Sequence, residues 1–95
     1  MKIHELKIAY EYGAAKLRGE KLFEIRKNDR DFKVGDLVHY TLLPSGDEEK
    51  NGRVSLWEQK AREVFADKRF YKIIYITDYA QQDGYVVFGE QEIKI

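Results

Sequence analysis

The sequence predicts a small α+β domain whose mixed or largely antiparallel β-sheet curls into a barrel. First, the 95 residues carry strand-like and helix-like hydrophobic patterns in the order β-α-β-β-α-β-β. Second, short turns separate most of the strand patterns, and two helices are too few to cover both faces of a parallel sheet. Third, the chain has no repeat, linker or low-complexity tract, which indicates a single domain over residues 1–95.

The first strand is expected over residues 2–8, where apolar and polar side chains alternate. The apolar residues Ile3, Leu6 and Ile8 do not share one parity. A bulge or twist near Glu5 would reconcile them, so the pattern predicts an irregular strand.

A short helix is expected over residues 9–17. The apolar residues there are spaced four and three positions apart, as on one face of a helix; they are Tyr10, Ala14 and Leu17. Gly19 follows directly in the position that commonly ends a helix.

Residues 21–28 return to the alternation of a strand with one apolar and one polar face. We expect Phe23 and Ile25 to face the core. The polar face carries Glu24, Arg26 and Asn28.

The middle of the chain predicts a strand, an exposed loop and a helix. Residues 37–43 form an apolar run that Pro44-Ser45-Gly46 ends. Residues 45–53 are almost wholly polar and predict the most exposed and most mobile loop. A capping box begins at Ser55, and apolar residues at three- and four-residue intervals predict a helix over 55–66 that Trp57 anchors to the core.

The last third predicts a hairpin. Residues 69–80 are rich in Phe, Tyr and Ile, residues 85–93 are again strand-like, and Asp83-Gly84 between them is a turn signal. Four tyrosines are expected to fill the core, although stacking on nucleobases is the functional alternative; they are Tyr71, Tyr75, Tyr79 and Tyr85.

Composition and charge exclude several classes of protein. The chain has no cysteine, which excludes disulfides, a thiolate metal site and a cysteine nucleophile. His4 and His39 alone cannot supply a three-histidine site, so we expect no metal and no cofactor. A lone histidine more often makes a structural hydrogen bond than it contacts a ligand.

The 17 basic and 17 acidic residues cancel, which disfavours non-specific coating of nucleic acid. Any basic patch must lie within residues 1–33, where cations are in excess. Apolar runs are short and no apolar signal stretch opens the sequence, so we expect a cytoplasmic protein that does not enter a membrane.

The densest cluster of candidate functional residues runs from Gly19 to Asp31. A carboxylate at Glu24 two residues from the guanidinium of Arg26 can form a charge-assisted pair that fixes both side chains. The guanidinium would keep spare donors for a phosphate, a carboxylate or a base edge. The alternative is a solvated strand face with an ordinary surface ion pair.

The pattern Gly19-x-Lys21-x-x-Glu24-x-Arg26, placed after a short helix and before Val34-Gly35-Asp36, resembles the signature of ASCH domains of the PUA-like superfamily. Three segments look like a small bacterial and phage family of uncharacterised ASCH-related domains; they are residues 4–7, 23–32 and 83–87. Residues 45–68 do not resemble the family core and are interpreted as a helical insertion.

The resemblance implies a PUA-like mixed β-pseudobarrel of about five strands with two helices, and a cleft beside the first helix and the loop after the second strand. It also implies binding of RNA or of a nucleotide-like ligand. Some compact ASCH relatives are amidohydrolases of acylated cytidine in which a lysine matches Lys21 and a threonine matches Glu24. The glutamate at position 24 removes that hydroxyl, which argues against carrying the mechanism over.

The leading hypothesis is therefore a binding module without catalysis, whose partner is RNA or a nucleotide-like small molecule. The ligand-binding residues it predicts are Lys7, Lys21, Glu24, Arg26, Asn28 and Arg30. One alternative is a small amidohydrolase with Lys21 and Glu24 as catalytic residues; in a regular strand these two point to opposite faces, so they meet only if Lys21 lies in the preceding turn or at a bulge. Another alternative is a protein-interaction module that uses the inserted helix.

Overall fold

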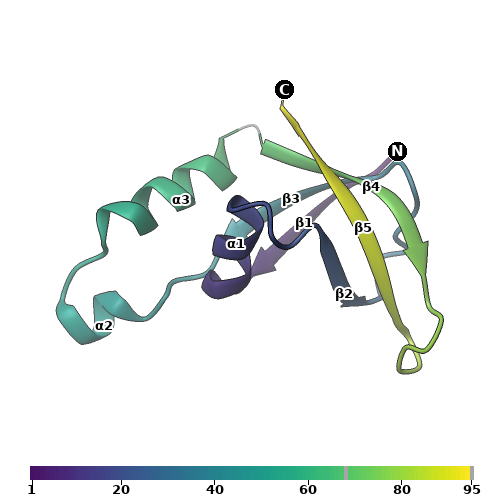
Figure 1. Cartoon of the computed structure of the whole chain (residues 1–95), viewed down its shortest axis with the longest axis horizontal. Helices are drawn as coiled ribbons and strands as arrows, with labels where there is room; N and C mark the ends of the chain where they lie inside the picture. The colour runs from purple at the N-terminus through teal and green to yellow at the C-terminus, as the bar shows by residue number, and fades with distance from the viewer. Residues whose placement is uncertain (68, 95) are drawn as a thin grey trace.

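A computed structural model describes residues 1–67 and 69–94 of the chain. Its five strands are β1 (Ile3–Ile8), β2 (Phe23–Lys27), β3 (Leu37–Leu42), β4 (Arg69–Thr77) and β5 (Tyr85–Lys94). Its three helices are α1 (Tyr10–Leu17), α2 (Asp47–Asn51) and α3 (Leu56–Ala66). The strands form one curled sheet, and α2 and α3 extend from it as an arm at one end (Figure 1).

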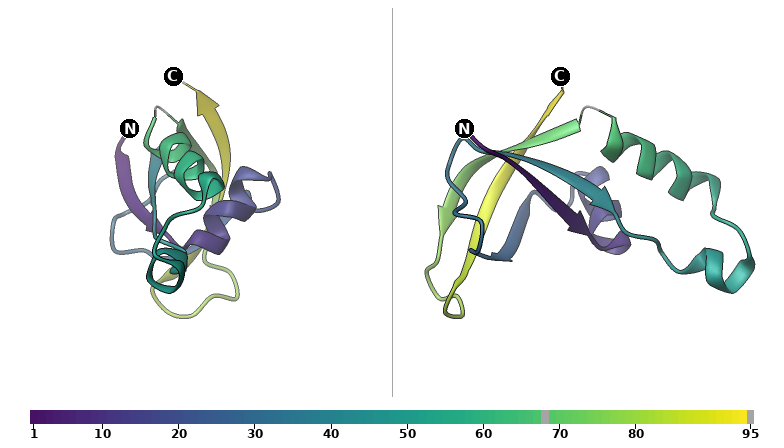
Figure 2. Two further views of the ribbon diagram at one scale, coloured as in Figure 1. Left: turned by 90° about the vertical axis from the view of Figure 1, so that its left-hand side faces the viewer. Right: turned by 180° about the vertical axis from the view of Figure 1, so that it is seen from behind.

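The α+β class and the curled mixed sheet are confirmed. The strand order is β1-β3-β4-β5-β2. Only β1 and β3 are parallel; the other three pairings are antiparallel. A parallel pair needs a long crossover, and α1 together with β2 supplies it. Figure 2 shows how the sheet curls so that β1 and β2, its two edge strands, come to the same side of the molecule.

The first strand is regular, so the predicted bulge near Glu5 is wrong. All six residues of β1 pair in unbroken register with β3, from Ile3 with Leu37 to Ile8 with Leu42. The inward positions belong to His4, Leu6 and Ile8, and Ile3 is exposed. The inward position that was expected for Ile3 belongs to the polar residue His4. The three inward residues therefore lie at alternate positions, as in a regular strand.

The real irregularity lies in β4, where the register with β5 shifts between Ile73 and Tyr75. Such a bulge increases local twist and helps a sheet to curl. Tyr71 is buried as predicted, whereas Tyr75 and Tyr79 are exposed and the prediction that they fill the core is wrong for both. Tyr85 is half-buried.

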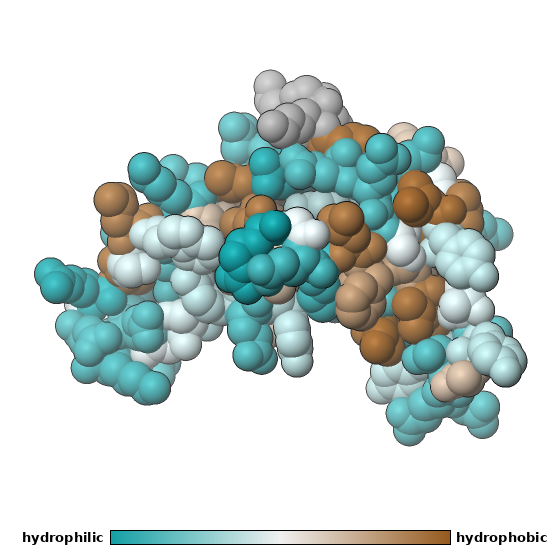
Figure 3. Space-filling view, viewed as in Figure 1, coloured by the Kyte–Doolittle hydropathy of each residue, from teal (hydrophilic) through white to brown (hydrophobic). Residues whose placement is uncertain are grey.

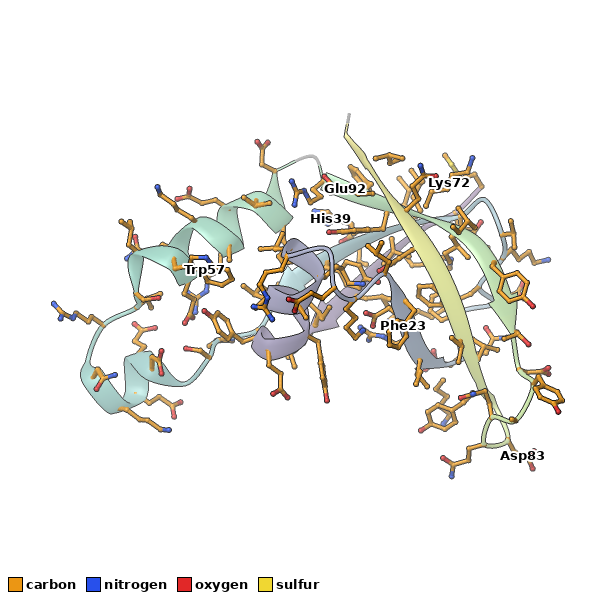
Figure 4. All side chains as sticks on the ribbon, in the orientation of Figure 1. Phe23, His39, Trp57, Lys72, Asp83 and Glu92 are labelled. Carbon is orange, nitrogen blue, oxygen red and sulfur yellow. The ribbon has the colours of Figure 1, made fainter. Side chains whose placement is uncertain are left out.

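The core lies inside the curl and beneath α3. It consists of Leu6, Ile8, Phe32, Val38, Tyr40, Leu42, Ala61, Phe65, Tyr71, Ile73, Val86 and Phe88. Helix α3 covers β3 through Ala61 and Phe65. The prediction that Trp57 anchors this helix is wrong: Trp57 is 47% exposed, on the side of α3 that faces α1 (Figure 4), where it meets the ring of Tyr10 edge-on at 5.8 Å.

The polar segment 45–53 is exposed as predicted, but it is not wholly a loop. It contains α2, whose first turn is acidic and whose last turn carries Lys50, an arrangement that complements the helix dipole. Gly46 and Gly52 flank it with positive φ angles of 93° and 74°. The predicted capping box of α3 is present, since the Ser55 side chain accepts from the Glu58 amide.

Candidate functional site

The strand β2 turns the side chains of Glu24 and Arg26 inward, which reverses the predicted faces. Glu24 is only 4% exposed, whereas Phe23 and Ile25 are 44% and 55% exposed on the outside. The alternation of the sequence correctly separated Phe23 and Ile25 from Glu24 and Arg26, but it did not show which pair faces inward. The inside accepts these charges because it already holds partners for them.

Those partners begin with Lys16, whose side chain is fully buried. Its ammonium lies 3.1 Å from a Glu24 carboxylate oxygen and also binds Glu90 on β5. The rings of Tyr40 and Tyr71 flank it at about 5 Å, as in a cation–π contact. Sequence reasoning missed Lys16 and Glu90, because nothing in their local pattern separates them from solvated residues.

The end of α1 explains how Lys16 and Lys21 both reach Glu24. The Gly19 amide bonds the Lys16 carbonyl and the Glu20 amide bonds the Ala15 carbonyl, a Schellman ending that needs the positive φ of Gly19. The chain reverses there, and Lys21 lies in the connection before β2. Its ammonium therefore reaches the Glu24 carboxylate at 2.5 Å, and the requirement that Lys21 precede the strand is met.

Arg26 completes the cluster from the other side. Its Nε donates to the second Glu24 oxygen at 3.0 Å, and its Nη2 donates to the Lys7 carbonyl of β1 at 2.9 Å. The guanidinium thus spans the two edge strands of the sheet. We call the space between them, lined by residues 5–9 and 21–30, the seam.

The pKa values of the two carboxylates in the cluster, Glu24 and Glu90, shift in opposite directions. Burial alone would raise the pKa of Glu24, but the charge of Lys16, the hydrogen bond from Lys21 and the charges of Lys21 and Arg26 hold that pKa below its usual value. Burial raises the pKa of Glu90, although Lys16 opposes it. Tyr40 donates its hydroxyl to Glu90 at 2.8 Å, and burial raises the pKa of this phenol, so it remains a donor. Glu24 is a fixed anion that orders three cations.

A pocket of about 500 Å³ opens from this cluster onto the seam. Its lining residues are Lys7, Ile8, Ala9, Tyr12, Lys21, Phe23, Glu24, Ile25 and Arg26. The two aromatic side chains among them, Tyr12 and Phe23, are about half exposed. Hydrophobic atoms gather on this side of the molecule, over β2, β4 and β5 (Figure 3), and Phe23 lies there beside β2 (Figure 4).

Four of the predicted ligand-binding residues therefore line one pocket; they are Lys7, Lys21, Glu24 and Arg26. Arg30 lines a neighbouring pocket. Asn28 lies in the turn after β2, where its side-chain oxygen accepts a hydrogen bond from the Phe32 amide. This hydrogen bond stabilises the turn. All of the cations in these two pockets belong to residues 1–33, where the charge asymmetry had placed any basic patch.

Both histidines make the structural contacts expected of lone histidines. His4 is buried against Phe32 and pairs with Asp36 at 2.8 Å, and His39 pairs with Glu5 at 2.7 Å. Residues 1–67 and 69–94 contain no group of three potential metal ligands. Within the same residues, no helix has the length and apolar character needed to cross a bilayer.

The interaction-module alternative requires exposed apolar side chains on the inserted helix. Leu56 is 68% exposed and Trp57 is 47% exposed on α3. That alternative stays a prediction.

The family described as "Domain of unknown function (DUF3850)" matches residues 3–90, nearly the whole chain, so the chain belongs to this family. No curated protein is similar enough to count as a relative.

Proposed function

We propose that this member of the DUF3850 family is a nucleotide- or RNA-binding module that holds its ligand in the seam pocket. One observation carries the proposal: Arg26 is fixed by Glu24 and by the Lys7 carbonyl. Its guanidinium has five N–H donors, and these two contacts leave others free at the pocket mouth. A guanidinium held in one orientation suits phosphate and base-edge recognition.

The rest of the pocket supports the same ligand class. Its volume lies in the range of small-molecule sites. Tyr12 and Phe23 offer exposed aromatic faces on which a base can stack. The Lys21 ammonium lies 5.5 and 5.0 Å from the centres of these two rings, so aromatic and cationic groups meet at one wall.

We also propose that the domain is related to the PUA-like ASCH domains. What supports this is the motif from Gly19 to Arg26 at the entry to the second strand, the short helix before it, and the curled mixed sheet. Cytoplasmic location remains part of this proposal.

The binding proposal is tested by titrating labelled single-stranded RNA and nucleoside monophosphates into Arg26→Gln. Loss of a ligand-contacting arginine should weaken binding by about 1 to 3 kcal/mol. Arg18→Gln is the matched control, because Arg18 also pairs with a neighbouring glutamate, at 2.9 Å, but lies outside the pocket. Lys7→Gln is the second variant, since Lys7 is exposed and its ammonium has no carboxylate partner within residues 1–67 and 69–94. Unaltered affinity in both variants rejects the proposal.

Hydrolysis of an acylated nucleoside is the second candidate, because Lys21 and Glu24 meet in the pocket. A carboxylate that is already paired with three cations has little basicity left for a general base, which favours binding over catalysis. Turnover of acylated cytidine by the intact protein, lost in Lys21→Ala, would establish the hydrolase. Absence of turnover in the intact protein rejects it.

A further inference from the structure

A second pocket, of about 410 Å³, continues the seam beyond Arg26. Its lining residues are Glu5, Leu6, Lys7, Arg26, Lys27, Asp29, Arg30 and Phe32. The two pockets share Lys7 and Arg26, so they are neighbours along the same pair of strand edges. The Arg26 guanidinium, bonded to the Lys7 carbonyl, marks the point where one pocket passes into the other.

The two pockets differ in chemistry. Five of the nine lining residues of the first are apolar or aromatic. Six of the eight that line the second are charged, four cationic and two anionic. The first pocket suits a base and the second suits an anion.

The cations of the second pocket are also free to bind one. Within residues 1–67 and 69–94, Lys7, Lys27 and Arg30 have no carboxylate partner within ion-pair distance. Of the two carboxylates, Glu5 is already held by His39. The four cations outnumber the two carboxylates, so the pocket attracts negative charge.

We propose that this second pocket is a phosphate subsite, so that the ligand of the seam is a phosphorylated nucleotide and not a free base or nucleoside. The inference rests on the proposed function and names its ligand class. The base lies in the first pocket against Tyr12 and Phe23. A phosphate attached to that nucleotide lies between Arg26 and Arg30, with Lys7 and Lys27 on either side.

The phosphate can come from two sources, the terminal group of a mononucleotide or an internal group of a single-stranded oligonucleotide. Both present anionic non-bridging phosphate oxygens to the same donors. A terminal phosphate needs only the two pockets, whereas an internal one continues into a chain that leaves the seam. Ligand length distinguishes these sources.

The test compares a nucleoside, its 5′-monophosphate and a single-stranded RNA oligonucleotide by calorimetric titration. Arg30→Gln removes one free cation of the second pocket, and Asp29→Asn removes one of its two opposing charges. Lys72→Gln is the control, because Lys72 is an exposed cation on β4 outside both pockets, far from Phe23 (Figure 4). All three side chains are exposed, so melting temperatures should stay close to that of the parent protein.

The parent protein should bind the monophosphate about tenfold tighter than the nucleoside. Arg30→Gln should lower the affinity for the phosphorylated ligands about three- to tenfold and leave the affinity for the nucleoside unchanged. Asp29→Asn should raise the affinity for the phosphorylated ligands a few-fold. If Arg30→Gln weakens binding of the monophosphate, the subsite holds a terminal phosphate. If it weakens binding of the oligonucleotide alone, the subsite holds an internal phosphate. Added salt should lower the affinity for the phosphorylated ligands and leave the affinity for the nucleoside unchanged.

Two outcomes overturn the inference, and they are distinct. If the parent protein binds all three ligands and Arg30→Gln changes none, or changes all equally, the phosphate subsite is rejected and the proposed function stands. If the parent protein binds none of the three, the proposed function fails and the subsite fails with it.

Discussion

Among the charged groups that this small domain buries, the His4–Asp36 pair and the cluster around Glu24 differ in their access to the seam pockets. The His4–Asp36 pair is closed: the Asp36 carboxylate also accepts from the backbone amides of Lys2 and Lys33, and neither partner lines either seam pocket. In the cluster around Glu24 the carboxylate is held by the side chains of Lys16, Lys21 and Arg26, and Lys21 and Arg26 line the seam pocket. Burial of charge by itself does not mark a site; a cluster that retains free donors at a pocket does.

The largest effect is expected from Lys16→Met. Removing the ammonium leaves Glu24 and Glu90 buried without their shared partner, and loss of one member of a buried ion pair costs about 3 to 5 kcal/mol. Urea unfolding measures it, with Lys72→Met as an exposed control expected to change stability by less than about 0.5 kcal/mol. A loss below about 1 kcal/mol for Lys16→Met would show that the cluster does not stabilise the fold.

Asp36→Ala tests the closed cluster. It leaves His4 and two backbone amides without their acceptor, at a cost of about 2 to 3 kcal/mol in unfolding free energy. Nucleotide affinity should not change, because neither His4 nor Asp36 lines either seam pocket. A variant that folds normally but loses affinity would erase the distinction between the two clusters.

Gly13→Ala tests how closely α1, which carries Lys16, must approach the sheet. A Cβ at Gly13 would overlap Leu42 and press on Phe65, and overpacking of this kind costs about 1 to 3 kcal/mol. Better helix propensity returns about 1 kcal/mol, so we expect a net loss of about 1 kcal/mol by thermal unfolding. A stabilised variant would mean that α1 can move away from β3.

The smallest effect is a pH dependence at Glu90. Because burial raises its pKa, the folded protein binds a proton there more readily than the unfolded chain does. The stability of the parent relative to Glu90→Gln should therefore rise as the pH falls through the raised folded pKa toward the unfolded value of about 4.3. A difference that is constant with pH, or that falls on acidification, would contradict the assigned direction.

The sequence predicted most of the elements but not which side of them is inside. The helix ending at Gly19, the cap at Ser55 and the turn at Asp83-Gly84 rest on local backbone chemistry, which a sequence displays directly. The faces of β1 and β2 were misassigned because apolar residues were placed inward by default. His4 and Glu24 lie inside instead, since each has a buried partner: His4 pairs with Asp36, and Glu24 pairs with Lys16 of α1.

The candidate site was predicted in part for the same reason. Lys21, Glu24 and Arg26 lie within six residues, so a local pattern connects them. Lys16, Tyr40 and Glu90 come from an α-helix and two further strands. Only the folded sheet brings these three beside Glu24, and no spacing rule links them beforehand.

Amide chemical-shift mapping of the parent protein with a nucleoside monophosphate tests the central claim, ligand binding in the seam, most directly. The account predicts that the shifted amides concentrate in residues 5–9 and 21–30, on both sides of Arg26, and that the amides of α3 around Trp57 stay in place. Shifts centred on α3, or none anywhere at saturating ligand, would contradict it.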